Sequence, residues 1–316
     1  MSDNILKSGT SLMTPVTEEL VEDRMSPFIL HPGMKYRRVK RRDCSGGEIQ
    51  RLLAEGGITE CHDAIIKALG KYGYLNSFLI RTYLFHISGG GFDYDYSHMR
   101  RILKDLIKKG LIMSYELFYV ADGTEHGSPF FYTLSGGGIK YLKHQGITEL
   151  HPIISKPFSI ENVLNLLALN QFHVTFMQQY GKNVIVRCED YYDTVFKALG
   201  IPAVYTFKLR NEIDFQIALL SVRNSGKWVK KYLNQLRSLA DNMESFQNLI
   251  ILTICESEYQ TMECAKKQNC ERSLQDMDVF YITDTSIISG KNIFDRIIEV
   301  RPENDYSIRR TFRLNI

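Results

Sequence analysis

The stretch from Asn76 to Leu134 constrains the fold of this chain more than any other, because its hydrophobic spacing changes from a helical to a strand period. Between Tyr94 and Lys109 the apolar residues recur at helical intervals, which gathers them on one face of a helix. They are Met99, Ile102, Leu103, Leu106 and Ile107. Gly110 ends the pattern and is typical of a helix C-terminus. The sequence therefore predicts an amphipathic helix over residues 94–109.

A β-hairpin is expected directly after this helix. Residues 111–120 and 129–134 are rich in β-branched and aromatic side chains, which favour strands. Asp122-Gly123 lies between them and is a turn signal. The tip of the hairpin is then expected to cover residues 121–128.

Two further helices are predicted upstream, over residues 61–70 and 76–86, with Asn76 or Ser77 as an N-cap of the second. Three helices followed by a hairpin are typical of a winged helix-turn-helix domain, whose recognition helix enters the major groove of DNA. The polar face of the third helix offers donors for phosphates and base edges. Its candidate DNA-binding residues are Tyr94, Ser97, His98, Arg101, Lys104 and Lys108. The alternative interpretation is an ordinary solvated helix surface.

Residues 35–42 contain six cations and one aromatic residue. The cations are Lys35, Arg37, Arg38, Lys40, Arg41 and Arg42. The run follows an acidic segment and precedes Ser45-Gly46-Gly47, which has the composition of a linker. A flexible basic arm can follow the phosphate backbone or enter the minor groove. Residues 1–57 are therefore expected to form a disordered leader with a DNA-contacting arm, the alternative being a solubilising tail.

The composition fits a globular protein of two domains, since 44% of the 316 residues are hydrophobic and 11% aromatic. The net charge of +3 is too small to indicate nucleic acid, so any basic surface must be local. The sequence has no apolar run of about 18 residues that would span a membrane, and no signal peptide is recognised in residues 1–14. The six cysteines form no CxxC pair. We expect a cytoplasmic protein with no metal site and no cofactor.

The second half of the chain, residues 157–316, predicts an α/β domain in the order α-β-β-β-α-β-α-β. Helices are expected over residues 160–179, 226–243 and 258–268. Strands are expected over residues 184–187, 203–209, 213–222, 249–255 and 279–283.

A family resemblance rests on three segments. Leu134-Ser135-x-x-Gly138 closes the hairpin and opens a helix, and residues 165–176 and Ile201-Pro202-Ala203 lie downstream. With these segments the chain resembles the replication-relaxation family over roughly residues 58–285. The resemblance implies a winged helix followed by a restriction-endonuclease-like domain, in a family associated with plasmids and conjugative elements.

The resemblance also implies where catalytic residues would stand. Active domains of this kind carry an Asp after a Pro at the start of the second strand and a Glu-x-Lys on the third, which hold a divalent ion and position water. The corresponding residues here are Ala203 after Pro202, and Ser221-Val222-Arg223. Neither Ala nor Ser binds a hard cation as a carboxylate does. The resemblance therefore implies an inactive domain with no catalytic residues.

Three carboxylates leave a metal-dependent nuclease or nickase open as an alternative. Glu161 begins a predicted helix, and Glu212 and Asp214 border the third strand, so a displaced metal site is conceivable. Ordinary helix-start and turn carboxylates are the competing interpretation. His173, in the apolar helix, is either a general base or a packed histidine, and the second is commoner.

The sequence thus predicts an α+β winged helix-turn-helix domain over residues 58–150, followed by an inactive α/β restriction-endonuclease-like domain. We expect a non-catalytic, double-stranded DNA-binding protein of a bacterial mobile element that acts in plasmid replication, transfer or transcriptional control. Double-stranded DNA is the expected partner. A second copy of the chain and replication or conjugation proteins are further candidates. A protein-interaction scaffold is the remaining alternative.

Overall fold

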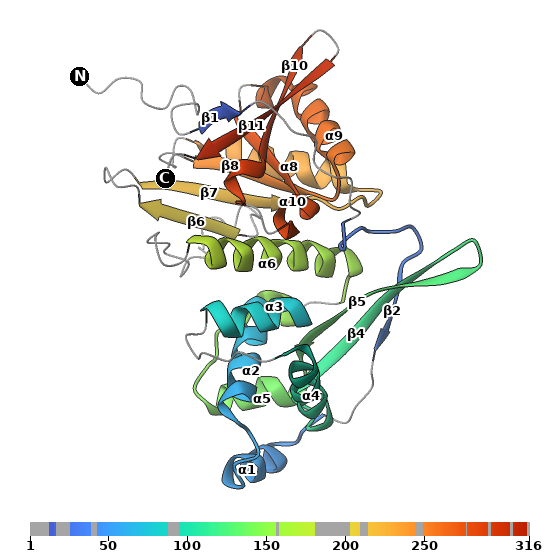
Figure 1. Ribbon diagram of the computed structural model, residues 1–316, viewed down its shortest axis with the longest axis vertical. Coiled ribbons are helices and arrows are strands. Elements are labelled where there is room, and N and C mark those ends of the chain that lie inside the picture. Colours follow the sequence, from blue (N-terminus) through green and yellow to red (C-terminus); the bar gives the residue numbers. More distant parts are fainter. Residues whose placement is uncertain are drawn as a thin grey trace. The chain divides into compact units, whose positions relative to one another are not determined.

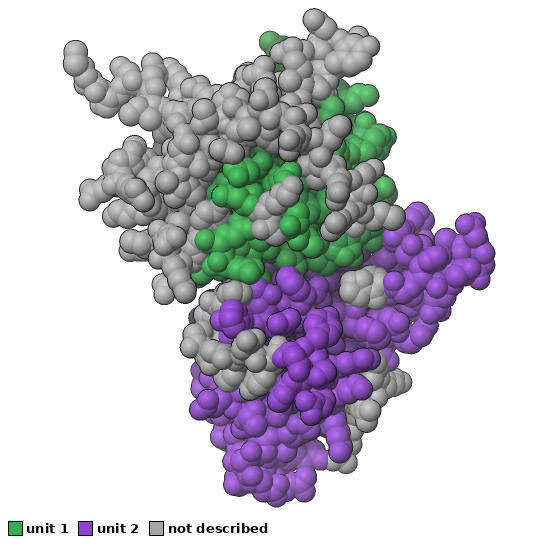
Figure 2. All heavy atoms as spheres, in the orientation of Figure 1, with its two compact units in different colours: residues 1–29, 171–316 green, residues 30–170 purple. Residues whose placement is uncertain are grey.

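The computed structural model describes residues 13–16, 26–38, 43–87, 95–155, 158–180, 203–208, 214–243, 249–275, 277–289, 292–303 and 306–314. The chain divides into two compact units, coloured separately in Figure 2. One is Leu30–Asn170, and the other joins Met1–Ile29 to Gln171–Ile316. Both units mix helices and sheet, so the chain is α+β (Figure 1). Across the described ranges, every helix is too short or too polar to cross a bilayer.

Among the described residues, the unit Leu30–Asn170 is built around four strands. These are β2 (Lys35–Arg38), β3 (Leu75–Asn76), β4 (Ile112–Ala121) and β5 (Thr124–Leu134). Its helices are α1 (Gly46–Ala54), α2 (Glu60–Tyr72), α3 (Ser77–Thr82), α4 (Tyr96–Lys108) and α5 (Gly136–His144). A π-helical turn, η2 (Tyr83–Ile87), extends α3, and a 3₁₀ turn, η3 (Pro152–Ser155), precedes α6 (Ile160–Tyr180). Helix α6 runs from this unit into the other.

The sheet of this unit has the strand order β2-β4-β5-β3, and each neighbouring pair is antiparallel. Asp122 and Gly123 form the turn between β4 and β5, with φ of 51° and 74°. Positive φ at both positions suits the two-residue hairpin turns that favour Asp-Gly. The pairing continues to Ala121 and Thr124, so the hairpin tip is shorter than the predicted 121–128.

One face of this sheet packs through aromatic rings. Tyr115 stacks on Phe131 at 5.3 Å between ring centroids and on Phe158 at 5.0 Å. Tyr74 meets Phe131 edge-on at 5.6 Å. These rings alternate along the strands with residues of the opposite face. Phe130 and Tyr132 therefore lie on the face away from this cluster.

The described part of residues 1–57 differs from the flexible leader that the sequence predicts. Lys35–Arg38 pair with β4, and Gly46–Ala54 form α1, whose capping box joins Ser45 to Glu48. His31 stacks on Tyr119 at 3.7 Å between ring centroids. The long hairpin offers β4 as an unpaired edge, and β2 fills it. The number of cations in residues 35–42 gives no indication that β2 pairs with β4.

The described part of the other unit contains a seven-stranded sheet. Its strands are β1 (Met13–Val16), β6 (Ala203–Lys208), β7 (Asp214–Ser221), β8 (Leu249–Cys255), β9 (Val279–Thr283), β10 (Ile297–Glu303) and β11 (Tyr306–Leu314). Helices are α8 (Trp228–Ala240), α9 (Glu258–Asn269) and α10 (Asp284–Ile288), with 3₁₀ turns η6 (Arg272–Leu274) and η7 (Phe294–Arg296).

The strand order is β1-β11-β10-β9-β8-β7-β6, with β7, β8 and β9 parallel and the remaining pairs antiparallel. Helices α8 and α9 bury Tyr232, Leu236 and Cys264 in a core with the sheet. The predicted strands from 203 onward and the helices between them are confirmed within a few residues. The predicted strand 184–187 lies outside the described residues. Strands β1, β10 and β11 were not predicted.

Gly137 and Gly138 explain the glycine run that opens α5. A Cβ on Gly138 would lie 2.2 Å from the backbone oxygen of Leu111, and one on Gly137 would lie 2.4 Å from that of Gly110. Ser135 fixes this approach, since its Oγ accepts from the Gly138 backbone N at 3.1 Å and donates to the Gly110 oxygen at 2.5 Å. The first turn of α5 therefore packs directly on the chain that joins α4 to β4.

Gly138→Ala is expected to destabilise the protein by about 1–3 kcal/mol, because the added methyl group meets backbone that no rotamer change can move. Gly136→Ala is the matched control, since its Cβ would meet only the Asp43 carboxylate, at 3.3 Å. Urea unfolding followed by circular dichroism measures the difference. Equal unfolding midpoints for the two variants would contradict the close packing.

Candidate nucleic-acid interface

Helix α4 is oriented by its apolar side. Met99, Leu103 and Leu106 are each at most 2% exposed. Because these positions recur at helical spacing, the opposite side of α4 must face outward. That side carries Arg100, Arg101, Lys104 and Lys108, all exposed.

These four cations form no ion pair within the described part of the chain. By contrast, Lys109 bonds to Asp105 one turn away, and Lys67 bonds to Asp63 on α2 at 2.7 Å. Cations without a carboxylate partner keep their full charge for an incoming phosphate. The exposed face of α4 is therefore a local basic surface on a chain of low net charge.

The N-terminus of α4 is held by Asp95. Its Oδ1 accepts from the backbone N of His98 at 2.6 Å and from Ser97 Oγ at 2.8 Å. These hydrogen bonds, that from His98 first, lower the pKa of Asp95. A carboxylate at this position also suits the helix dipole. The predicted base-contacting Ser97 thus donates its proton within the protein and keeps its oxygen as an acceptor.

A polar tie joins α4 to α2. Asp105 Oδ2 lies 3.3 Å from His62 Nε2 and is bonded by Lys109, whose Nζ also donates to the Gly57 oxygen at 2.6 Å. The other ring nitrogen of His62, Nδ1, accepts from the Thr59 backbone N at 3.2 Å and completes the capping box of α2. The tie fixes α4 at the end opposite to Asp95.

Strand β2 brings the predicted basic arm alongside the hairpin. Arg37 pairs with Glu125 at 2.8 Å and with Glu116 at 3.5 Å, and its guanidinium lies 4.8 Å from the centroid of the Phe118 ring. Arg38 Nη2 donates to Met113 Sδ at 2.6 Å. Arg37 is exposed but partly neutralised, so it presents less free charge than the sequence implied.

Four of the predicted DNA-binding residues lie outside the described residues: Tyr94, Lys40, Arg41 and Arg42. The structure brings Ser97, His98, Arg101, Lys104 and Lys108 together on α4. It places Arg37 and Arg38 on β2.

The sequence interpretation missed Arg100 and the aromatic residues near it. Arg100 lines a hollow of about 340 Å³ with Tyr96, Phe78, Phe130 and Tyr132. The spacing of Tyr96, Arg100 and Lys104 at four-residue intervals was a readable signal that these side chains share a face. Phe130 and Phe78 gave no such signal, because the sequence does not show that they are exposed.

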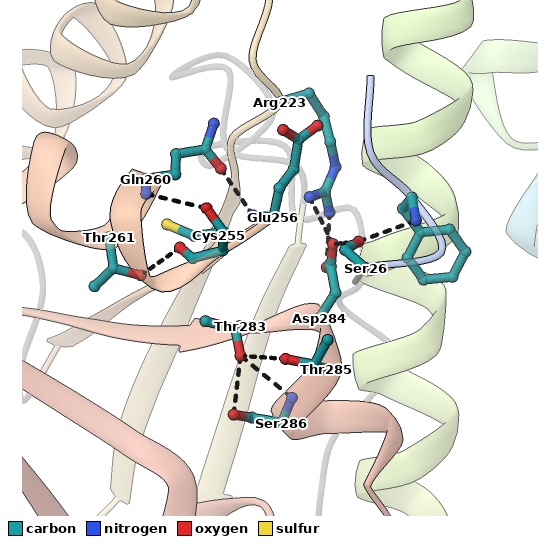
Figure 3. A network of polar contacts seen from close by, with 12 residues as sticks. Ser26, Arg223, Cys255, Glu256, Gln260, Thr261, Thr283, Asp284, Thr285 and Ser286 are labelled. Atoms are coloured by element: carbon teal, nitrogen blue, oxygen red, sulfur yellow. Dashed lines mark hydrogen bonds and ion pairs between the residues drawn. The ribbon is translucent and has the colours of Figure 1, made fainter. Parts of the chain in front are cut away.

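The other unit holds a buried polar network at the carboxyl ends of its parallel strands (Figure 3). Arg223, just after β7, donates to both carboxylate oxygens of Asp284 at 2.9 and 3.0 Å, and both side chains are fully buried. Ser26 donates to the same carboxylate. Burial raises the pKa of Asp284, while Arg223 and the hydrogen bonds oppose this shift. Ser26 thereby ties the N-terminal segment to this unit.

The described candidate catalytic positions lie on or beside α6, β6 and β7. Ala203 begins β6 and Ser221 ends β7, while Arg223 is committed to Asp284. Glu161 lies in the first turn of α6 and Asp214 begins β7, whereas Pro202 and Glu212 are outside the described residues.

His173 is a buried histidine, 2% exposed, within α6.

No family model, curated protein or solved structure matches the chain.

The pH dependence of stability should report the His62 tie. Burial, and then the charge of Lys109, lower the pKa of His62 below 6.5, against the opposing effect of Asp105. The unfolded chain therefore binds a proton that the folded one resists, so stability falls as pH drops below about 6.5. Protonation of Nδ1 would also remove the acceptor of the Thr59 hydrogen bond.

His62→Gln keeps a capping-box residue and is expected to flatten the fall in unfolding free energy between about pH 7 and pH 5.5. His144→Gln, at an exposed position on α5, is the control and should keep the wild-type slope. Urea unfolding at each pH measures these slopes. An unchanged slope in His62→Gln would show that the tie does not titrate as described.

Proposed function

We propose that this chain is a double-stranded DNA-binding protein in which α4 is the recognition helix of a winged helix. The observation that carries the proposal is the exposed row of Arg100, Arg101, Lys104 and Lys108 without ion-pair partners among the described residues. On this proposal Arg101 and Ser97, near the helix start, reach base edges, and Lys104 and Lys108 hold phosphates.

The order of elements supports the same proposal. Helices α2, α3 and α4 precede the β4–β5 hairpin, and the short β3 after α2 pairs with β5 (Figure 1). A winged helix has this order, with the hairpin as its wing. The wing itself carries Glu116 and Glu125, and β2 supplies Lys35 and Arg37 beside it. We assign to β2 the backbone-contacting role that the wing's own residues do not provide.

We propose further that the other unit is an inactive restriction-endonuclease-like domain, as the resemblance to the replication-relaxation family implies. Ala203 and Ser221 stand where carboxylates would be needed, and Arg223 is already paired with Asp284. Such a unit would serve as a second DNA surface or contact another copy or a replication or transfer protein. The corresponding setting is the cytoplasm of a bacterium that carries a plasmid or conjugative element.

Two alternatives make different predictions. A metal-dependent nuclease would cut DNA when Mg²⁺ is added. A protein-interaction scaffold would not bind DNA at all. A scaffold would give the row of cations on α4 no role, and a nuclease would need carboxylates that Ala203 and Ser221 do not provide, which is why we favour non-catalytic DNA binding.

Duplex binding at several salt concentrations tests the proposal. The double variant Arg101→Ala, Lys104→Ala should bind more weakly, and the slope of log affinity against log salt should become shallower by about 0.9, since Lys104 is the one phosphate contact among the two residues and about 0.9 is lost per phosphate contact. Lys140→Ala, Lys143→Ala removes the same charge from exposed positions of α5 and should bind as the wild type does.

Each contrary outcome has a clear meaning. No binding by the wild type would overturn the proposal in favour of a scaffold. An equal loss of DNA affinity in both double variants would show that binding depends only on the net charge of the protein. Cleavage that depends on Mg²⁺ would overturn the assignment of an inactive second unit.

A further inference from the structure

A hollow beside the proposed recognition helix has an unusual lining. It holds about 340 Å³ between the start of α3, the first turns of α4 and strand β5. Three of its rings are about half exposed: Phe78 at 48%, Tyr96 at 57% and Phe130 at 46%. A volume of this size lies at the small end of ligand pockets, which hold about 300–1,000 Å³.

Polar groups at the hollow are few and fixed. Tyr96 Oη is hydrogen-bonded to Ser77 Oγ at 2.9 Å, which positions the tyrosine ring at the rim. Asn76 accepts from the Leu79 backbone N at 2.8 Å through Oδ1, so its amide nitrogen is the group left to donate. Arg100 supplies the charge, and the described lining includes no carboxylate.

This combination selects the chemistry of the occupant. Aromatic faces beside an arginine suit a flat, uncharged ring joined to an anionic group. A nucleotide has both parts. An acidic peptide would match the charge but not the aromatic faces, and an apolar side chain would leave Arg100 unused. The row of cations continues along α4 through Arg101, Lys104 and Lys108. A nucleic-acid strand, with its series of phosphates, therefore matches this surface better than a free mononucleotide does.

The rings also determine the state of the base. In a duplex the flat faces of each base are covered by its neighbours, and proteins read only the edges. A base that meets Phe78, Tyr96 or Phe130 through its face must first leave the stack. We therefore propose that this hollow takes one unstacked base, so that the protein prefers duplex DNA with an unpaired nucleotide over fully paired duplex. The inference rests on the proposed DNA-binding function.

Two end-labelled probes test it by fluorescence anisotropy: a paired duplex, and the same duplex with one extra unpaired adenine at its centre. The wild type should bind the second about five- to tenfold more tightly, as expected from stacking of one base on aromatic rings. The double variant Phe78→Ala, Phe130→Ala should lose most of this preference. Both side chains are half exposed, so the variant is expected to fold.

Tyr259→Ala is the control, because Tyr259 is a 76% exposed ring on α9 in the other unit. It should keep both the affinity and the preference. Equal binding of the two probes by the wild type would overturn this inference while leaving the DNA-binding function in place. Binding of neither probe would overturn both. A preference that survives in the double variant would assign it to another part of the protein and reject the hollow.

Discussion

The burial of Met99, Leu103 and Leu106 is the constraint on which the candidate interface depends. Burying each such side chain stabilises the fold by about 1.5–3 kcal/mol, so the helix cannot rotate without a large cost. Because that side is fixed, the opposite side of α4 must face solvent, and it carries Arg100, Arg101, Lys104 and Lys108. Asp95 and Asp105 then hold the two ends, one by capping the helix and the other through His62. The carboxylates of α4 are thus used structurally, and its exposed cations remain unneutralised by them.

The second determinant is the pairing of β2 with β4. It converts part of a basic segment into an ordered strand and places Arg37 opposite Glu116. The ion pairs of Arg37 are exposed, and such pairs contribute about 0–1 kcal/mol, so they are readily exchanged for phosphate contacts. Arg37 is therefore available to a phosphate only when its ion pairs break, whereas the row of cations on α4 is available at all times. The exposed cations of α4 can therefore meet a phosphate without first giving up an ion pair.

Much of the fold followed from local pattern. The third helix and the hairpin were predictable because the period of hydrophobicity changes at Gly110, and the buried strands β8 and β9 because their apolar runs are unbroken. Strands β10 and β11 were missed because charged residues interrupt their pattern, and the edge strand β1 because its partner, β11, is about 300 residues away in sequence. In the candidate site the cations on α4 were found by spacing. The hollow was not, since Phe78 and Phe130 become neighbours only through tertiary packing, which no local pattern encodes.

The proposed function requires that the exposed side of α4 touches DNA. Site-specific photo-crosslinking would detect this contact, with a photoreactive phenylalanine placed either at position 101 on α4 or at position 237 on α8, and a labelled duplex as the target. Position 237 is a suitable comparison because Arg237 is exposed and paired with Glu271. We expect a covalent DNA adduct from position 101 that unlabelled duplex competes away, in a higher yield than any adduct from position 237. Adducts from position 237 with none from position 101 would show that α4 does not touch the DNA.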